Sequence, residues 1–184
     1  MATTLDLDPE LITFMRQQKD RQEIMDCLLR YTRGVDRHDR ALMASAYHPG
    51  AIDQHGVAPD LDGEKFTDWA IGWHGEFQTR HQHIITNHSI ELDGDTAHGE
   101  TYYIFWGENR EGPPTLAFGR YIDRFERREG RWAIAHRVCV NEVTGNFEKA
   151  AVPDEWKTLL FSTGPNRRDR EDISYRRPLV RTVN

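Results

Sequence analysis

The segment RHQHIITNHSIEL holds the histidines best suited to acid–base chemistry in this sequence. A histidine titrates near neutral pH, and a neutral ring whose second nitrogen donates to a carboxylate is poised to remove a proton. Period-two alternation along a strand predicts one face with His81, His83, Ile85 and Asn87, and the opposite face with His88. A carboxylate that the fold brings to one of these rings would complete such a site.

The best-placed carboxylate is Asp36, in the segment YTRGVD at the predicted end of a long first helix. We predict that Asp36 orients His83 as a general base and stabilises its protonated form. Tyr31 lies on the same helix and would face the same cavity, where its hydroxyl acts as an acid or holds a substrate oxygen. A second interpretation stays open, in which Asp36 is a helix-terminal carboxylate without a catalytic role.

The same histidines also permit a metal site, with His81 and His83 as two ligands and His88 or a carboxylate as a third. No third ligand has a diagnostic spacing, and the sequence contains no glycine-rich phosphate loop. We therefore expect neither a metal nor an organic cofactor. Cys27 and Cys139 are isolated, which indicates neither a disulfide framework nor a zinc knuckle and is typical of a reducing compartment.

Aromatic and polar side chains on later strands predict a pocket for a flat, largely apolar ligand. Thr101, Tyr103 and Phe105 alternate along GETYYIFW, and FGRYIDRF carries Tyr121. Aromatic residues in such positions are more often core packing than ligand contacts, so their role in a pocket depends on the curvature of the sheet. The predicted substrate-binding set is Thr101, Tyr103, Phe105, Tyr121, Asn141 and His88.

Hydrophobic spacing predicts two helices ahead of these strands. The first runs from Pro9 to about Val35 and admits a break near Gln18. Asp39 has the position of an N-cap for a short second helix, which residues 48–50 (His-Pro-Gly) would end.

A third helix is predicted over residues 63–78, with a heavily aromatic stripe that would form a wall or lid of the pocket. The pattern then changes to strands at 80–92, 96–107, 115–128 and 131–142, separated by turn sequences. Three successive turns predict an antiparallel meander. Helices followed by such a sheet indicate an α+β fold in which the helices cover one face of the sheet.

Three of these segments together resemble a known family. YTRGVD with its following helix, HQHIITNHSIEL and GRYIDRFERREGRWAIAHR are similar to the SnoaL-like branch of the nuclear transport factor two-like superfamily, over about residues 18–142. The resemblance implies a cone-shaped curved antiparallel sheet covered by N-terminal helices, with an internal pocket. Scytalone dehydratase, hexachlorocyclohexane dehydrochlorinase and bile-acid dehydratase members pair an aspartate with a strand histidine, which corresponds to Asp36 and His83 here, and the bile-acid enzyme's tyrosine corresponds to Tyr31.

The resemblance also has departures that bear on the substrate. Thr101 falls near a histidine that assists scytalone dehydratase, and Phe105 falls near an aspartate of the bile-acid enzyme. Neither substrate is therefore transferred. The fold is a safer expectation than the reaction, because this architecture supports enzymes and binding domains alike.

The expected function is a cofactor-independent lyase, or dehydratase, for a cyclic or aromatic hydroxylated small molecule. Isomerisation and carbon–carbon cleavage that releases formaldehyde stay open, since both also start at an acidic proton. Two other classes are a non-catalytic ligand-binding or oligomerisation module and a structural subunit similar to the small β chain of ring-hydroxylating dioxygenases.

The composition of the chain limits the classes of partner that we expect it to bind. The chain has 24 Lys and Arg residues against 30 Asp and Glu residues, a net charge of -6, which argues against nucleic acid or an anionic membrane as a partner. The N-terminal stretch has neither a long apolar run nor the bases of a signal peptide, so a soluble cytoplasmic protein is expected.

The chain length indicates a single domain, which we place at residues 1–142. Residues 143–184 are predicted to be an extension with one short helix and a charged tail, packing on the domain or on an oligomer partner. We expect a homodimer or homotrimer, because a sheet covered by helices on one side leaves its outer face in need of cover.

Overall fold

The computed structural model describes residues 8–56, 60–160, 162 and 166–180. Its helices are α1 (Pro9–Asp36), α2 (Arg40–Ala44), α3 (Gly63–Phe77) and α4 (Asp154–Leu160), with a 3-10 turn at Ile173–Tyr175. Its strands are β1 (Tyr47–Gln54), β2 (Leu61–Asp62), β3 (Gln78–Asp93), β4 (Thr96–Asn109), β5 (Thr115–Arg128) and β6 (Arg131–Asn146).

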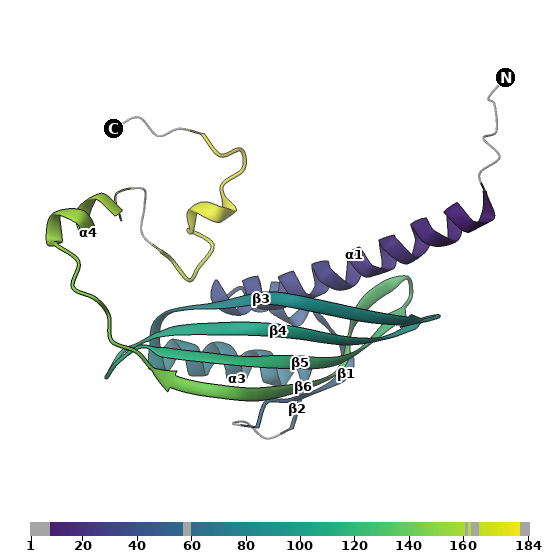
Figure 1. The fold of residues 1–184 in the computed structure, drawn as a ribbon, viewed down its shortest axis with the longest axis horizontal. Helices are drawn as coiled ribbons and strands as arrows, with labels where there is room; N and C mark the ends of the chain where they lie inside the picture. Colours follow the sequence, from purple (N-terminus) through teal and green to yellow (C-terminus); the bar gives the residue numbers. More distant parts are fainter. Residues whose placement is uncertain (1–7, 57–59, 161, 163–165, 181–184) are drawn as a thin grey trace.

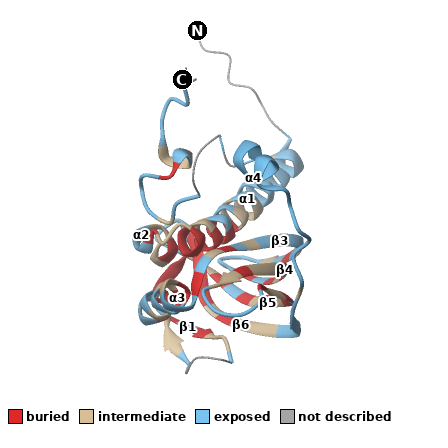
Figure 2. Cartoon of the chain, turned by 90° about the vertical axis from the view of Figure 1, so that its left-hand side faces the viewer, coloured by how far each residue is buried: buried red, intermediate tan, exposed pale blue. Residues whose placement is uncertain are grey.

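The strands form one curved, unclosed sheet in the order β2-β1-β6-β5-β4-β3. The four long strands are an antiparallel meander, as predicted, and β1 adds to β6 in parallel. Helix α1 lies along one edge of the sheet and α3 lies behind it (Figure 1). Buried residues gather between α1, α3 and the inner face of the sheet, which gives the predicted α+β arrangement (Figure 2).

Helix α1 is continuous, so the break admitted near Gln18 does not occur. Asp8 caps its first turn by accepting from the backbone N–H of Glu10 at 2.8 Å, and Pro9 occupies a position where a missing N–H costs nothing. The residues around the suspected break include the helical ion pair Lys19–Glu23 at 3.5 Å, and neither glycine nor proline interrupts them.

Strand β1 is absent from the sequence-based prediction, because Pro49 and Gly50 indicated only the end of a helix. The structure accommodates both residues within the strand through a register irregularity between Tyr47 and Ile52 against β6. Gly50 has a φ of 76°, which glycine adopts without strain. The first half of the chain therefore supplies a strand as well as helices.

A β-bulge in β3 corrects the predicted face of His88. The partner of Ile85 is Tyr103, but the partner of His88 is Thr101, so β3 uses one residue more than β4 across this interval. The extra residue turns His88 to the same inner face as His83. Strict alternation had placed the two rings on opposite faces.

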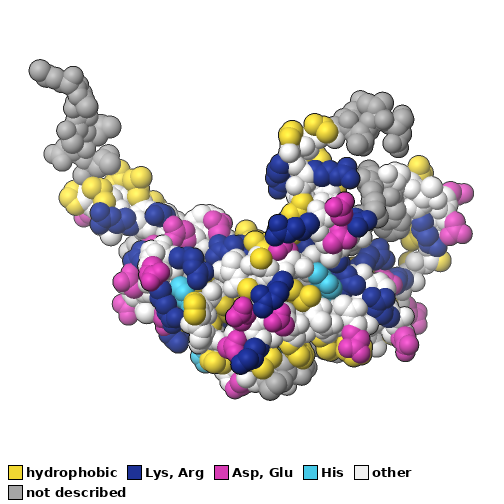
Figure 3. Space-filling view, turned by 180° about the vertical axis from the view of Figure 1, so that it is seen from behind, with side chains coloured by type: hydrophobic (Ala, Val, Ile, Leu, Met, Phe, Trp, Pro, Cys, Tyr) yellow, Lys and Arg dark blue, Asp and Glu magenta, His cyan; other side chains and the backbone are white. Residues whose placement is uncertain are grey.

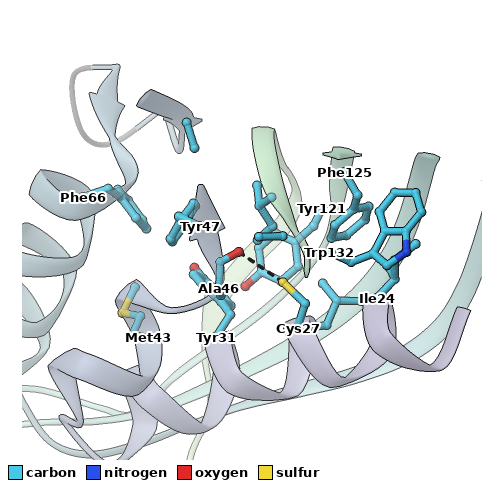
Figure 4. Close-up of a cluster of buried hydrophobic side chains, with 14 of the residues drawn as sticks. Ile24, Cys27, Tyr31, Met43, Ala46, Tyr47, Phe66, Tyr121, Phe125 and Trp132 are labelled. Carbon is cyan, nitrogen blue, oxygen red and sulfur yellow. Dashed lines mark hydrogen bonds between the residues drawn. The ribbon is translucent and has the colours of Figure 1, made fainter. Parts of the chain in front are cut away.

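The hydrophobic core joins α1, α2, β1, α3 and the inner face of the sheet (Figure 4). Gly34 permits α1 and α2 to approach closely, because a Cβ at this position would lie 2.4 Å from the backbone nitrogen of Met43. Cys27 is buried and donates its thiol hydrogen to the carbonyl of Ala46 at 3.1 Å (Figure 4). Each fully buried large aliphatic or aromatic side chain contributes roughly 1.5–3 kcal/mol to this core.

The C-terminal segment contacts the domain at the junction of α1 and α2. Tyr175 donates its hydroxyl hydrogen to Asp39 at 2.9 Å, and Arg37 donates to the side-chain oxygen of Asn166 at 2.6 Å. Asp172 is buried despite the charged composition of the segment. Strand β6 continues to Asn146, four residues beyond the predicted end of the meander at residue 142.

The surface of the helical face carries side chains of both signs interspersed over most of its area (Figure 3). Among the described residues, no helix is both long enough and apolar enough to cross a bilayer.

Candidate active site

A pocket of about 480 Å³ lies between α3 and the inner face of the sheet. Its lining comes from α1, α3, the four long strands and His55, which directly follows β1. The lining is mainly apolar and aromatic, with Phe66, Trp69, Trp73, Phe105 and Tyr121 among its members. This volume lies within the range of small-molecule sites, roughly 300–1,000 Å³. A larger and more open groove of about 710 Å³, near the junction of α2 and β1, contains neither Asp36 nor His83.

Asp36 and His83 form a hydrogen-bonded pair at this pocket. The backbone N–H of His83 donates to both carboxylate oxygens of Asp36, at 3.1 and 3.0 Å, and its Nδ1–H donates to Oδ1 at 2.7 Å. With Nδ1 committed to Asp36, the neutral ring carries its lone pair on Nε2, and His83 lines the pocket. The end of α1 and the middle of β3 are thus joined at the position the sequence predicted.

Two neighbouring histidines, His74 and His81, pack against the ring of His83. His81 donates from Nε2 to the backbone carbonyl of Val35 at 3.1 Å, and burial lowers its pKa. His74 donates from Nδ1 to Gln78 at 2.7 Å, and burial, followed by the charge of His83, lowers its pKa to about 3. The His74 and His81 rings stack with centroids 4.1 Å apart, so two neutral rings pack against the proposed base.

The alternative prediction of a metal site concerns the same cluster of side chains around His83. One ligand atom each from Asp36, His81 and His83 lies within 4.8 Å of the others. In the present arrangement these atoms are engaged in hydrogen bonds, His83 to Asp36 and His81 to the carbonyl of Val35. A metal would have to replace both bonds, so the donor set fits an oriented histidine better than a preformed metal centre.

Tyr31 lines the pocket, but its nearest polar partner is not His83. Its hydroxyl lies 3.5 Å from Nε2 of His55, whereas its ring centroid lies 6.5 Å from that of His83. Burial raises the pKa of Tyr31, so its hydroxyl keeps its proton. The buried guanidinium of Arg137 packs on this ring at 4.3 Å and is held by two 2.7 Å bonds to Asp123.

The predicted substrate-binding residues divide into two groups. Four of them line the pocket: Tyr103, Phe105, Tyr121 and Asn141. Thr101 and His88 do not; they contact each other at 2.8 Å between Oγ1 and Nδ1. Within the first group, Tyr103 donates its hydroxyl hydrogen to Oδ1 of Asn141 at 2.5 Å.

A second histidine–aspartate pair was missed by the sequence-based prediction. Nδ1 of His55 contacts Oδ1 of the fully buried Asp53, and Tyr47 donates its hydroxyl hydrogen to Oδ2 of the same carboxylate. The alternation Asp53-Gln54-His55 was the available signal, since it places both residues on one face of a strand. That signal could not be used, because β1 itself was not predicted from the sequence.

Comparison with known proteins agrees with this architecture. A family of SnoaL-like domains matches residues 16–138, more than half of the chain. The chain belongs to the SnoaL-like domain family. Among curated proteins, the uncharacterized protein Rv2910c of Mycobacterium tuberculosis is 28% identical over 126 residues, which cover 65% of this chain and 83% of that protein.

Solved structures with the same SnoaL-like fold include two described as enzymes. Hexachlorocyclohexane dehydrochlorinase LinA-type3 from Novosphingobium barchaimii LL02 has a TM-score of 0.69 at 20% identity, covering 76% of this chain and 98% of that one. A Novosphingobium aromaticivorans protein assigned as a scytalone dehydratase has a TM-score of 0.65 at 15% identity, covering 74% and 93%. At these identities the likeness shows the fold, and the family contains both catalytic and non-catalytic members.

Proposed function

We propose that this protein is a cofactor-independent lyase that eliminates water, or a comparable leaving group, from a cyclic or aromatic hydroxylated small molecule. The observation that carries the proposal is the 2.7 Å contact between Nδ1 of His83 and Oδ1 of Asp36, beside a largely apolar pocket. A carboxylate held in this way fixes the tautomer of the ring and stabilises the imidazolium that forms when the ring accepts a proton.

The pocket lining supports a flat ligand. Aromatic side chains from α3 and the sheet line a cavity large enough for a ring system, and the polar groups of the lining include His83, His55 and Asn141. A substrate carbon that carries an acidic hydrogen would lie against Nε2 of His83. Exclusion of water by the aromatic wall would strengthen each electrostatic contact made there.

Screening tests this proposal. The purified protein is incubated with hydroxylated bicyclic aromatic ketones, steroids and polyketides, and mass spectrometry reports the loss of water. Loss of formaldehyde instead assigns a carbon–carbon lyase, and an unchanged mass with a new spectrum assigns an isomerase. Ligand binding without turnover in any of these classes assigns a binding module and contradicts the lyase.

The proposed assembly is a homodimer or homotrimer formed through the outer face of the sheet. A row of apolar side chains crosses four neighbouring strands there, in which Ile84 pairs with Ile104, Ile104 with Phe118 and Phe118 with Val143. Ile84, Phe118 and Val143 are 45%, 41% and 60% exposed. A second copy of this chain would cover the row. A monomeric mass by light scattering across a wide concentration range would contradict the assembly.

A further inference from the structure

His55 lines the same pocket as His83 but comes from the other end of the sheet. His55 directly follows β1, and β1 and β3 are separated in the sheet by β6, β5 and β4. The curvature of the sheet brings both histidines to one cavity. Tyr31 lies between them, with its hydroxyl 3.5 Å from Nε2 of His55. The His55 ring stacks on Phe66 with centroids 4.4 Å apart, which fixes its plane.

The surroundings of His55 favour its protonated form. Burial opposes the charge, but the negative charge of Asp53 and its hydrogen bond outweigh burial and raise the pKa of His55 to about 9. Among the described residues, Tyr31 from α1, Tyr121 from β5 and Cys139 from β6 also face this ring. The nearby cation is Arg137, which packs on the rings of Tyr31 and Tyr121 and is paired with Asp123. At neutral pH His55 is therefore an imidazolium, and its protonated Nε2 lies 3.5 Å from the hydroxyl of Tyr31 at the pocket.

We propose that His55 is the general acid of the reaction and protonates the departing oxygen of the substrate. The inference rests on the proposed function, in which His83 is the base. It gives the second histidine–aspartate pair a catalytic role, with Asp53 as a positioning residue. Tyr31, which keeps its proton, holds the oxygen beside Nε2 of His55.

The elimination balances with these two groups alone. His83 Nε2 takes the hydrogen of the acidic carbon as a proton, and the electrons of that C–H bond form the new carbon–carbon double bond. The neighbouring C–O bond breaks with its electron pair on oxygen, which takes the Nε2 proton of His55 and leaves as water. His83 ends protonated and His55 neutral, and exchange of one proton with solvent restores both.

Two substrates that differ only in their leaving group distinguish the role of His55 as acid from the role of His83 as base. β-Hydroxy-α-tetralone must lose hydroxide, which needs a proton, whereas β-chloro-α-tetralone loses chloride, which leaves unaided. We expect His55→Gln to slow the hydroxy ketone on the order of 10²-fold or more and to leave the chloro ketone nearly unchanged. His83→Gln should slow both.

A matched control is His136→Gln. His136 lies on β6 beside β1 and contacts Gln54 at 2.7 Å, but it does not line the pocket, so both ketones should react at the wild-type rate. Equal losses on both substrates, or none on either, in the His55 variant overturn its role as the acid. A His83→Gln variant with wild-type turnover of both ketones overturns the proposed function instead.

A binding measurement gives an answer that does not depend on turnover. At pH 8 an acidic nitrophenol is a phenolate, and an imidazolium in the pocket should bind it about tenfold more tightly in the wild-type protein than in His55→Gln. Nitrobenzene, which is neutral, should bind both proteins alike. Equal affinity of the two proteins for the phenolate, or no binding to either, overturns the inference.

Discussion

Two histidine–aspartate pairs face one pocket, and their carboxylates have different surroundings. Asp36 accepts hydrogen bonds from both the backbone and the ring of His83, at the end of a helix where its side chain is 12% exposed. Asp53 is fully buried and shares its charge between His55 and the hydroxyl of Tyr47. A carboxylate with little access to water stabilises a neighbouring cation strongly, whereas one that also binds backbone mainly fixes the position of its ring.

The largest expected effect is the loss of the first pair. Asp36→Asn and His83→Ala should each reduce turnover on the order of 10²-fold or more, because positioned general-base catalysis is lost. The double variant should be little worse than the worse single variant, since residues that act as one unit are not additive. Steady-state kinetics on the substrate found by screening measures all three.

Folding must be controlled in that comparison. Circular dichroism and melting curves establish whether each variant keeps the native fold, because a destabilised protein would mimic a catalytic defect. Folded single variants with near-normal turnover would show that Asp36 is only a helix-terminal carboxylate.

The sequence revealed the first pair and not the second for a physical reason. Asp36 and His83 lie in segments with strong helical and alternating patterns, so their elements and faces could be read directly. His55 directly follows a short strand that contains Pro49 and Gly50, and its partners Tyr31 and Phe66 come from two helices. Such contacts depend on the curvature of the sheet, which local patterns do not contain.

The bulge in β3 was likewise not predicted from the sequence, so His88 was assigned to the wrong face of the strand. One extra residue reverses the face of everything beyond it, and nothing in IITN distinguishes a bulge from regular strand. By contrast, the boundaries of α3, β3, β4 and β5 and the start of β6 were predicted closely, because aromatic helical spacing and Gly-containing turns are local signals.

The second expected effect is a change in the pH dependence. If His55 supplies a proton, the rate of water loss in the wild-type protein should fall as the pH rises through about 9. Asp53→Asn removes the charge that raises the pKa of His55, so this alkaline limb should move to lower pH. A pH–rate profile of both proteins measures the shift. An alkaline limb at the same pH in both proteins would show that Asp53 does not set the pKa of the catalytic acid.

The third expected effect is on the pH dependence of stability. It has opposite signs for His55 and for His74, which packs beside His83. The pKa of His55 is raised from 6.5 to about 9, so its contribution is complete below pH 6.5 and is lost as the pH rises through 9. The pKa of His74 is lowered to about 3, so stability is lost as the pH falls below 6.5. Each histidine changes the free energy of unfolding by at most roughly 1.4 kcal/mol per pH unit within its window.

Urea titrations from pH 5 to pH 10 would resolve these windows, with the wild type, His55→Gln and His74→Gln compared at each pH. We expect the first variant to flatten the alkaline decline and the second to flatten the acidic decline. An alkaline decline of the same slope in His55→Gln would be inconsistent with the pairing to Asp53.

The smallest expected effect is that of Tyr31→Phe. The substitution removes one hydroxyl and keeps the ring that packs on Arg137 and Tyr121, so the fold should be preserved. Turnover of a hydroxylated substrate should fall about tenfold, which corresponds to one hydrogen bond. Turnover of the β-chloro ketone should be nearly unaffected; a larger loss there than in His83→Ala would place Tyr31, and not His83, at the acidic carbon.

Incorporation of solvent deuterium into α-tetralone tests the central claim most directly. This ketone has no leaving group, so exchange at the carbon beside its carbonyl reports proton removal alone, measured by NMR in deuterium oxide. We expect exchange above background with the wild type and with His55→Gln, and exchange on the order of 10²-fold slower with His83→Gln and Asp36→Asn. Wild-type exchange by a folded His83→Gln variant would contradict the assignment of His83 as the base.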